Sequence, residues 1–487
     1  MSREAWSDPM RRPLLLAAAL LATTLAGCTG GGPSGDGVED PATAWASPDD
    51  PLPVGEDHDH RDAAQHRFAR NATLLAHASL EEWGRSNEVP VGAHALAVRG
   101  GLLAVAVNGG ETGEGQNGFH LFDVSRPGAL GHLAFWDAGE PVNGDRTIAF
   151  SPDGGTVFLG FEDGGRPGIA AIDVTVPAEP VEAGFWSDAS GYGPHTVAAG
   201  EIGGVTYVFS LALGVTIIQY DQGAFTVVGK YITNDELTVL DALGMLDPSA
   251  QDPTAAGSTY ALRSLYGHDM NLYNDPETGK ALLLIAYAYD GAKIVDVSIP
   301  SAPVLQARWM PPADTSHKHY THSMTAERME DGRLVVVVGS ETFEEENQAI
   351  ASPIWILDAT DAAAGAPLQS DPVHLGTWRN PGGAPAGHLG LSVHFFRQQD
   401  GFLYLSHYHG GVWAFDLRTE AARADVTSFA YILPVPDPAV VPPQDCCIGF
   451  DLDGIPMVFD VEVGPGGDVF AADIIQGVTR IGLQHPA

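Results

Sequence analysis

The sequence predicts an all-β fold built from one unit that recurs along the chain, and three observations lead to this prediction. Residues 392–417 read as three short apolar runs separated by a polar turn and a Gly-Gly turn, which is the pattern of an antiparallel meander. Glycine and proline account for 58 and 35 of the 487 residues, as expected of a chain with many turns. Hydrophobic residues make up 44% of the chain, enough for a large core.

The same unit occurs seven times, at intervals of about 50 to 70 residues, which is the spacing of propeller blades. The copies span residues 94–124, 146–174, 195–220, 268–297, 322–358, 392–417 and 460–483. A fourth run that ends near an aromatic residue follows each copy except the last, whereas residues 74–83, before the first copy, match such a run. We therefore predict a seven-bladed β-propeller in which an N-terminal strand closes the last blade and leaves no open sheet edge.

Three copies end in a shared motif, which reads IVDVSIPSAP, LFDVSRPGAL and AIDVTVPAEP. These segments resemble the LVIVD repeats of bacterial and archaeal cell-surface β-propellers. The resemblance extends over residues 74–484 and implies a propeller at the cell surface. It implies no particular chemistry, because that family is largely uncharacterised and one fold serves many functions.

Residues 1–28 are predicted to be an export signal. Two arginines precede an apolar run, residues 13–25, and the sequence Leu25-Ala26-Gly27-Cys28 follows it. This arrangement resembles a bacterial lipobox, which implies that Cys28 becomes the lipidated N-terminus of a protein held at the cell envelope. The alternatives are an ordinary secretory signal with an incidental cysteine, or a short membrane anchor, although the apolar run is too short to span a bilayer.

Residues 29–66 are predicted to be a flexible tether, and residues 67–487 the propeller. The tether is rich in Gly, Pro, Ser and Asp near its start, a composition that cannot bury enough apolar surface to order itself. The formal net charge of -38 argues against nucleic acid and anionic lipid surfaces as partners. No apolar run is long enough to cross a bilayer, so we expect only the lipid to enter the membrane.

The connections between the predicted strands differ in length on the two faces of the ring. Turns between first and second strands are short, whereas second-to-third turns and blade-to-blade connections are long. Binding and catalysis concentrate on long loops of a rigid scaffold, so we predict that the second face carries the function and call it the working face. Its long segments are residues 108–118, 232–267, 310–321, 341–353, 379–393 and 433–456.

Histidines open the innermost strand of most copies, at the working-face end of the predicted channel. The positions are His94, Arg146, His195, His268, His322 and His394, with Phe459 or Asp460 in the seventh copy. His407 and His409 end a second strand, which returns to the same face. Neutral imidazoles that converge on an axis suit copper, zinc, iron or nickel, and an open coordination position would make the site catalytic. The alternative is that each histidine bonds to a neighbouring blade and serves packing.

A second resemblance concerns Leu405-Ser406-His407-Tyr408-His409-Gly410-Gly411 and the apolar strand that follows it. This segment is similar to a strand-turn-strand of the selenium-binding protein (methanethiol oxidase) propellers, which implies copper or another redox metal. The adjacent Cys446 and Cys447 of an exported chain are candidates for a vicinal disulfide, an intermolecular pairing or thiolate metal ligands. Two small buried apolar residues are the alternative.

Two functions follow from these patterns. The first is a metal-dependent enzyme that oxidises or hydrolyses a small molecule at the channel mouth, where Arg146 binds an anionic substrate; the leading ligands are His195, His268, His322 and His394, with His94 as a further candidate. The second is a lipid-anchored scaffold that presents its long loops to a protein or glycan. No GxSxG, HExxH, P-loop or dinucleotide motif occurs in a suitable context, so known catalytic motifs do not choose between them.

Overall fold

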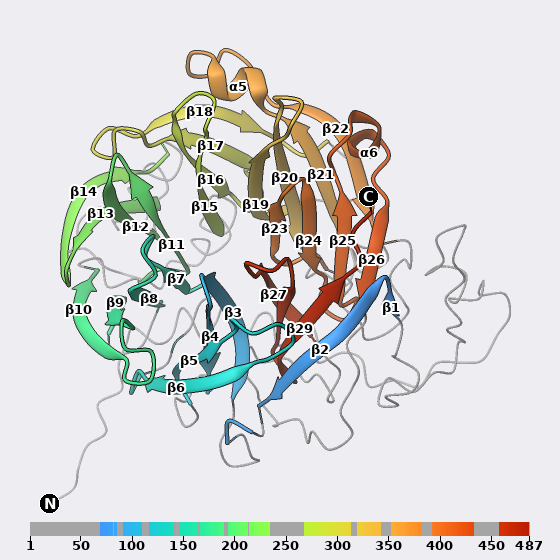
Figure 1. Ribbon diagram of the computed structural model, residues 1–487. Coiled ribbons are helices and arrows are strands. Elements are labelled where there is room, and N and C mark those ends of the chain that lie inside the picture. Colours follow the sequence, from blue (N-terminus) through green and yellow to red (C-terminus); the bar gives the residue numbers. More distant parts are fainter. Residues whose placement is uncertain are drawn as a thin grey trace, which may run out of the picture.

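The computed structural model describes residues 69–80, 82–84, 91–109, 116–140, 142, 146–162, 166–188, 193–212, 214–233, 267–312, 319–341, 352–380, 392–432 and 457–486. These residues form seven small antiparallel sheets arranged in a ring (Figure 1). The protein is therefore a seven-bladed β-propeller, and the predicted fold class is confirmed. The predicted signal with Cys28, the tether, Cys446 and Cys447 lie outside the described residues. Among the described residues, no helix has the length and apolarity needed to cross a membrane.

Blades 1 to 3 each consist of four consecutive strands, of which the first lies at the channel and the fourth at the rim (Figure 1). Blade 1 contains β3 (Gly92–Arg99), β4 (Leu102–Asn108), β5 (Gly118–Asp123) and β6 (Gly131–Asp137). Blade 2 contains β7 (Ile148–Phe150), β8 (Thr156–Phe161), β9 (Gly168–Asp173) and β10 (Val181–Ser187). Blade 3 contains β11 (Thr196–Ile202), β12 (Val205–Ala212), β13 (Gly214–Asp221) and β14 (Ala224–Tyr231).

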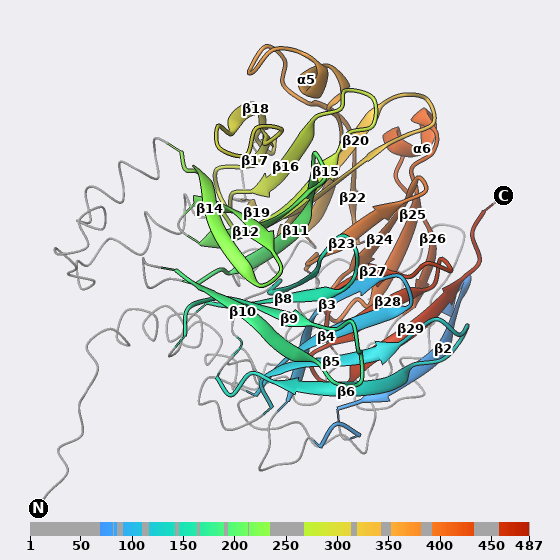
Figure 2. The same ribbon diagram turned by 60° about the vertical axis from the view of Figure 1, so that its left-hand side comes forward.

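Blades 4 to 6 follow the same order, and two short helices lie at the rim of blades 5 and 6 (Figure 2). Blade 4 contains β15 (Asp269–Asn274), β16 (Ala281–Ala286), β17 (Ala292–Asp296) and β18 (Val304–Trp309). Blade 5 contains β19 (Tyr320–Arg328), β20 (Leu334–Glu341), β21 (Pro353–Asp358), α5 (Thr360–Ala364) and β22 (Val373–Arg379). Blade 6 contains β23 (Phe396–Gln399), β24 (Phe402–Ser406), β25 (Val412–Asp416), α6 (Glu420–Ala424) and β26 (Ser428–Ile432).

The seventh blade joins the two ends of the described chain. Its inner strands are β27 (Val458–Val463), β28 (Val469–Asp473) and β29 (Gly477–Leu483), and β2 (Ala72–Ser79) pairs antiparallel with β29. The predicted closure by an N-terminal strand is thus confirmed. One strand was not predicted: β1 (Ala69–Arg70) pairs with β26 and adds a fifth strand to blade 6.

Hydrophobic clusters fill the interfaces between neighbouring blades all the way around the ring. Between blades 5 and 6, for example, Val337 and Ile356 belong to the same buried cluster as Leu405 and Phe415. Each blade therefore buries both of its faces. This explains why β20 reads LVVVVGSE and is buried throughout, instead of alternating between apolar and polar residues.

The repeated Asp-Val-Ser/Thr motif forms a turn after the third strand of a blade. The Oδ1 atom of Asp123 accepts hydrogen bonds from the N–H of Ser125 at 2.9 Å and from its hydroxyl at 2.6 Å. Asp173 does the same with Thr175, at 2.8 and 2.6 Å. These bonds lower the pKa of both carboxyl groups. The motif therefore recurs because its side chains build the same turn in successive blades.

Strand register places the start of the innermost strands on the working face. The first residue of β11 lies opposite the end of β12, with Thr196 paired to Leu211, and the first residue of β15 lies opposite Ala286 at the end of β16. The first residue of an inner strand thus shares a face with the second-to-third turn of its blade. The long working-face segments themselves lie largely outside the described residues.

Candidate metal centre at the propeller axis

Four neighbouring blades, 3 to 6, each place one histidine beside the channel. His195, His268 and His394 lie at or just before the start of their inner strands, and His322 lies within β19. The ring centroids of successive histidines are 4.5, 4.1 and 4.3 Å apart. These four imidazoles therefore form a continuous arc, called here the histidine arc.

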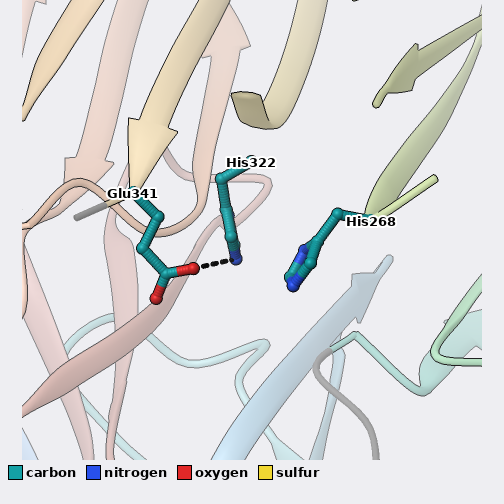
Figure 3. A group of neighbouring side chains, drawn as sticks. All are labelled: His268, His322 and Glu341. Atoms are coloured by element: carbon teal, nitrogen blue, oxygen red, sulfur yellow. Dashed lines mark ion pairs between the residues drawn. The ribbon is translucent and has the colours of Figure 1, made fainter. Parts of the chain in front are cut away.

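Glu341, the last residue of β20, lies against this arc. Its Oε2 atom is 3.2 Å from Nε2 of His322, and its Oε1 atom is 3.9 Å from Nε2 of His394. The side chains of His268, His322 and Glu341 offer ligand atoms that all lie within 4.8 Å of one another, and all three residues are buried. Figure 3 shows a ring nitrogen of His322 directed at the Glu341 carboxylate, with His268 beside it.

Glu341 was not predicted from the sequence to be a ligand. The signal that it offered was positional, because Glu341 ends a second strand opposite Tyr320 at the start of the neighbouring inner strand. A carboxylate at that position falls on the working face. Its cross-strand partner Tyr320 is two residues before His322, the histidine of the same blade. Acidic residues are frequent in this chain, so position alone did not distinguish this one.

In three of the arc histidines, the Nδ1 atom contacts a hydrogen-bond acceptor. The Nδ1 atom of His195 is 2.9 Å from Oε2 of Glu162, and that of His394 is 2.6 Å from the carbonyl oxygen of Phe459. The Nδ1 atom of His322 contacts Ser323 Oγ at 2.7 Å and the carbonyl oxygen of His394 at 3.2 Å. Carbonyl and carboxylate oxygens only accept, so Nδ1 carries the proton and the neutral ring presents a lone pair at Nε2.

The Nε2 atoms of the arc face one another and the carboxylate. Nε2 of His195 is 3.2 Å from Nε2 of His268, and Nε2 of His322 is 3.2 Å from Glu341. An imidazole nitrogen binds zinc at about 2.0 to 2.1 Å, which places neighbouring ligands of a tetrahedral ion about 3.3 Å apart. The pairs His195–His268 and His322–Glu341 thus have the spacing of neighbouring metal ligands, and the donors of His268, His322 and Glu341 lie within 4.8 Å of one another. Imidazole with carboxylate suits zinc, copper or iron, and not the oxygen-only environments of magnesium and calcium.

Tyr408, in the turn between β24 and β25, also contacts the cluster. Its hydroxyl donates a hydrogen bond to Oε1 of Glu341. The Tyr408 ring lies 5.0 Å from the ring of His394 and stacks at 5.8 Å on that of Phe459. Tyr408 is buried, so this hydroxyl is held within the site.

A buried layer of charges crosses the channel next to the histidine arc. Arg146 NH1 is 3.2 Å from Asp269 in blade 4, and NH2 is 3.5 Å from Asp460 in blade 7. The guanidinium carbon lies 4.0 Å from the ring centroid of Phe395, whose ring in turn contacts His322 and His394 at 5.1 and 4.2 Å. Arg146, predicted to bind an anionic substrate, is thus buried and paired with two carboxylates of its own chain.

The remaining predicted ligands lie in other surroundings. Nε2 of His94 in blade 1 is 3.3 Å from Thr147 Oγ1. The ring of His407 lies 5.8 Å from that of Trp378, and burial lowers the pKa of His407 to about 3. His409 is half-buried in the same turn. Within the part of the chain that the structure describes, the group of potential ligands comprises His268, His322 and Glu341. His94, His407 and His409 do not belong to this group.

No family model matches the chain, and no curated protein matches it. Among solved structures, Sqt1 from Chaetomium thermophilum is 12% identical, over 82% of this chain and 98% of that chain, with a TM-score of 0.49. The WD40 propeller domain of Doa1 is 10% identical, over 85% of this chain and 97% of that chain, with a TM-score of 0.46. Likeness of this degree carries no argument about function, and the class of protein rests on the sheet topology: a seven-bladed β-propeller.

Proposed function

We propose that this protein is an exported, lipid-anchored β-propeller that binds one transition-metal ion between His268, His322 and Glu341, with His195 and His394 beside it. One observation supports the metal site most. The imidazoles of His195, His322 and His394, whose Nδ1 atoms face acceptors, turn Nε2 towards His268 and a buried carboxylate. Such an arrangement is favourable only when a positive charge lies among the donors, because a buried carboxylate needs a counter-charge.

The donor set favours a catalytic ion. Imidazoles and one carboxylate at the end of a channel leave a coordination position for a small molecule, as catalytic sites do and closed structural sites do not. Glu162 and the carbonyl of Phe459 orient the rings of His195 and His394. The buried pair of Arg146 and Asp269 occupies the channel beyond the arc, so a substrate approaches from the working face. We propose oxidation or hydrolysis of a small molecule there, with the ion as Lewis acid or redox centre.

Cell-surface location and the choice of metal rest on the sequence. The export signal with Cys28 supports lipid anchoring, and the Asp-Val-Ser/Thr turns support the resemblance to LVIVD repeats. The similarity of residues 405–411 to the selenium-binding protein propellers favours copper. These parts of the proposal are tested separately, by the mass of the mature N-terminus and by the identity of the bound metal.

The metal site is tested by plasma mass spectrometry of the full-length protein, purified without a histidine tag or chelator. We expect about one equivalent of copper, zinc or iron per chain. The His322→Ala and Glu341→Gln variants should lose most of this metal. The control is His374→Ala, which removes an exposed histidine of β22 whose Nε2 bonds Gly376 O within its own strand.

Two results would contradict the proposal. The first is wild-type protein that takes up no metal even after reconstitution with each of these ions, while circular dichroism shows it folded. The second is an equal loss of metal from His374→Ala and from His322→Ala. A protonated His322 could also supply the positive charge beside Glu341. The same experiment separates this case from metal binding, because a protonated His322 paired with Glu341 leaves the metal content at zero.

A further inference from the structure

Two second-to-third turns of the ring, residues 287–291 in blade 4 and 407–411 in blade 6, have the same backbone structure. In each turn, the N–H of the first residue donates to the carbonyl oxygen of the fifth, and the carbonyl oxygen of the first accepts from the N–H of the fourth. The carbonyl oxygen of the second residue accepts from an N–H of the next blade. The bonds in blade 4 are Tyr287 N to Gly291 O at 2.7 Å, Asp290 N to Tyr287 O at 2.6 Å and Thr321 N to Ala288 O at 2.7 Å. Those in blade 6 are His407 N to Gly411 O at 2.8 Å, Gly410 N to His407 O at 2.7 Å and Val458 N to Tyr408 O at 3.1 Å.

The second residue of both turns adopts a left-handed backbone, with φ of 35° at Ala288 and 41° at Tyr408. This conformation is unfavourable for a residue with a side chain, and most so for a bulky one, at about 1 to 3 kcal/mol. Ala288 shows that the turn forms without a large side chain. The backbone therefore does not explain a tyrosine at position 408.

The side chain of Tyr408 reaches the proposed metal centre. Its hydroxyl donates to Oε1 of Glu341, while Oε2 of the same carboxylate lies 3.2 Å from Nε2 of His322. One oxygen of Glu341 is thus held by the tyrosine and the other faces the histidines. Because this backbone costs more for a bulky residue than for alanine, the contact with Glu341, and not the turn, accounts for a tyrosine at position 408.

We propose that Tyr408 is a positioning residue, which holds Oε1 of Glu341 so that Oε2 alone is presented to the metal ion. The inference rests on the proposed function, since it assigns the orientation of a ligand in the same site. Hydrogen bonds to ligating carboxylates orient them, and their loss typically weakens metal binding about 10- to 100-fold. The inference also explains why the chain keeps a strained tyrosine where the equivalent turn has alanine.

The test compares the full-length wild-type protein with Tyr408→Phe, which removes the hydroxyl and keeps the ring against His394 and Phe459. Metal-free protein is titrated with Co²⁺, and its visible absorption is recorded, because the spectrum reports the ligand geometry. We expect the dissociation constant to rise about 10- to 100-fold and the absorption bands to move. Tyr408→Ala should show the same weakening and still fold, because it gives blade 6 the turn residue of blade 4.

Tyr404→Phe is the matched control, since it removes a part-buried tyrosine hydroxyl of β24 that lies 2.8 Å from Nε2 of His485, outside the site. Circular dichroism and thermal unfolding check the fold of all variants. If folded Tyr408→Phe and Tyr408→Ala bind Co²⁺ with the affinity and spectrum of wild type and of Tyr404→Phe, the role of Tyr408 is overturned and the metal site stands. If wild type takes up no Co²⁺, the metal site and this inference are overturned together.

Discussion

Arg146 in blade 2 forms a buried ion pair with Asp269 in blade 4, with its NH1 atom 3.2 Å from each carboxylate oxygen. Its NH2 atom lies 3.5 Å from Asp460 in blade 7. One side chain thus links three blades across the channel. Burial raises the pKa of Asp269 and lowers the pKa of Arg146. The charge of Arg146 acts to lower the pKa of Asp269, and the charge of Asp269 acts to raise the pKa of Arg146. The charged state of each group therefore depends on its partner.

Arg146→Met should destabilise the protein by about 3 to 5 kcal/mol, because it removes the cation that contacts buried Asp269 and Asp460 and leaves them only Arg397, which is itself paired with Glu462. The measurement is the free energy of unfolding in urea. Arg166→Met is the control, since Arg166 pairs with Glu182 at the surface, with both side chains about a third exposed, and such pairs contribute under about 1 kcal/mol. If both changes have equal, small effects on the free energy of unfolding, Arg146 has no structural role, and the predicted role in anion binding is favoured.

Gly477→Ala should disrupt the closure of the ring. Gly477 begins β29 with φ of 106°, and a Cβ atom there would overlap the carbonyl oxygen of Ala78 in β2. The pairing of β2 with β29 leaves no room for it, so we expect a lower unfolding temperature and faster proteolysis before residue 80. Gly466→Ala, in the β27–β28 turn with open space around it, should leave both unchanged. Wild-type behaviour of Gly477→Ala would contradict the importance of this closure.

Asp473→Asn should stabilise the protein at neutral pH. Burial raises the pKa of Asp473 to about 6, although its Oδ1 accepts the N–H groups of Ile475 and Gln476. The folded state binds more protons than the unfolded state between pH 3.8 and about 6, so stability falls as pH rises through that window. The variant removes the charge, and its free energy of unfolding at pH 7 should be higher by about 3 kcal/mol. A gain that persists at pH 3.5 would argue against this cause.

His120→Gln should weaken the dependence of stability on pH in the acid range. Burial, and to a smaller extent His132, lowers the pKa of His120 to about 3 from an ordinary value of 6.5. The unfolded chain therefore binds more protons in that window, and stability is lost as pH falls from 6.5 towards 3. One proton corresponds to about 1.4 kcal/mol per pH unit. Denaturation from pH 6.5 to 4 should give a shallower slope for the variant, whereas parallel curves would exclude His120 as a source of acid sensitivity.

The architecture was predictable because it repeats. The period of the apolar runs predicted seven blades, and the unmatched run before the first copy predicted the closing strand. β1 was missed because two residues form no pattern, and α5 and α6 because five-residue helices show too little periodicity. β2 ends at Ser79, short of the predicted residue 83, and a turn follows in which Trp83 donates its N–H to the carbonyl oxygen of Leu80 at 3.1 Å.

The candidate site was predictable only in part. His195, His268, His322 and His394 stood out because they recur at one position of the repeat. Glu162, Glu341 and Tyr408 come from the ends of other strands or from turns, once each, so no repeat marks them. Whether they meet the histidines depends on how neighbouring blades pack around the axis, which is a property of the closed ring and not of a local segment.

The most direct measurement for the central claim is an anomalous difference map from crystals of the full-length protein, collected on both sides of the absorption edge of the metal found by mass spectrometry. We expect one peak at the propeller axis, about 2.0 to 2.2 Å from a ring nitrogen of His268, from Nε2 of His322 and from a Glu341 oxygen. A peak bound elsewhere, or a fully ordered histidine arc with no peak after soaking with copper, zinc and iron, would contradict it.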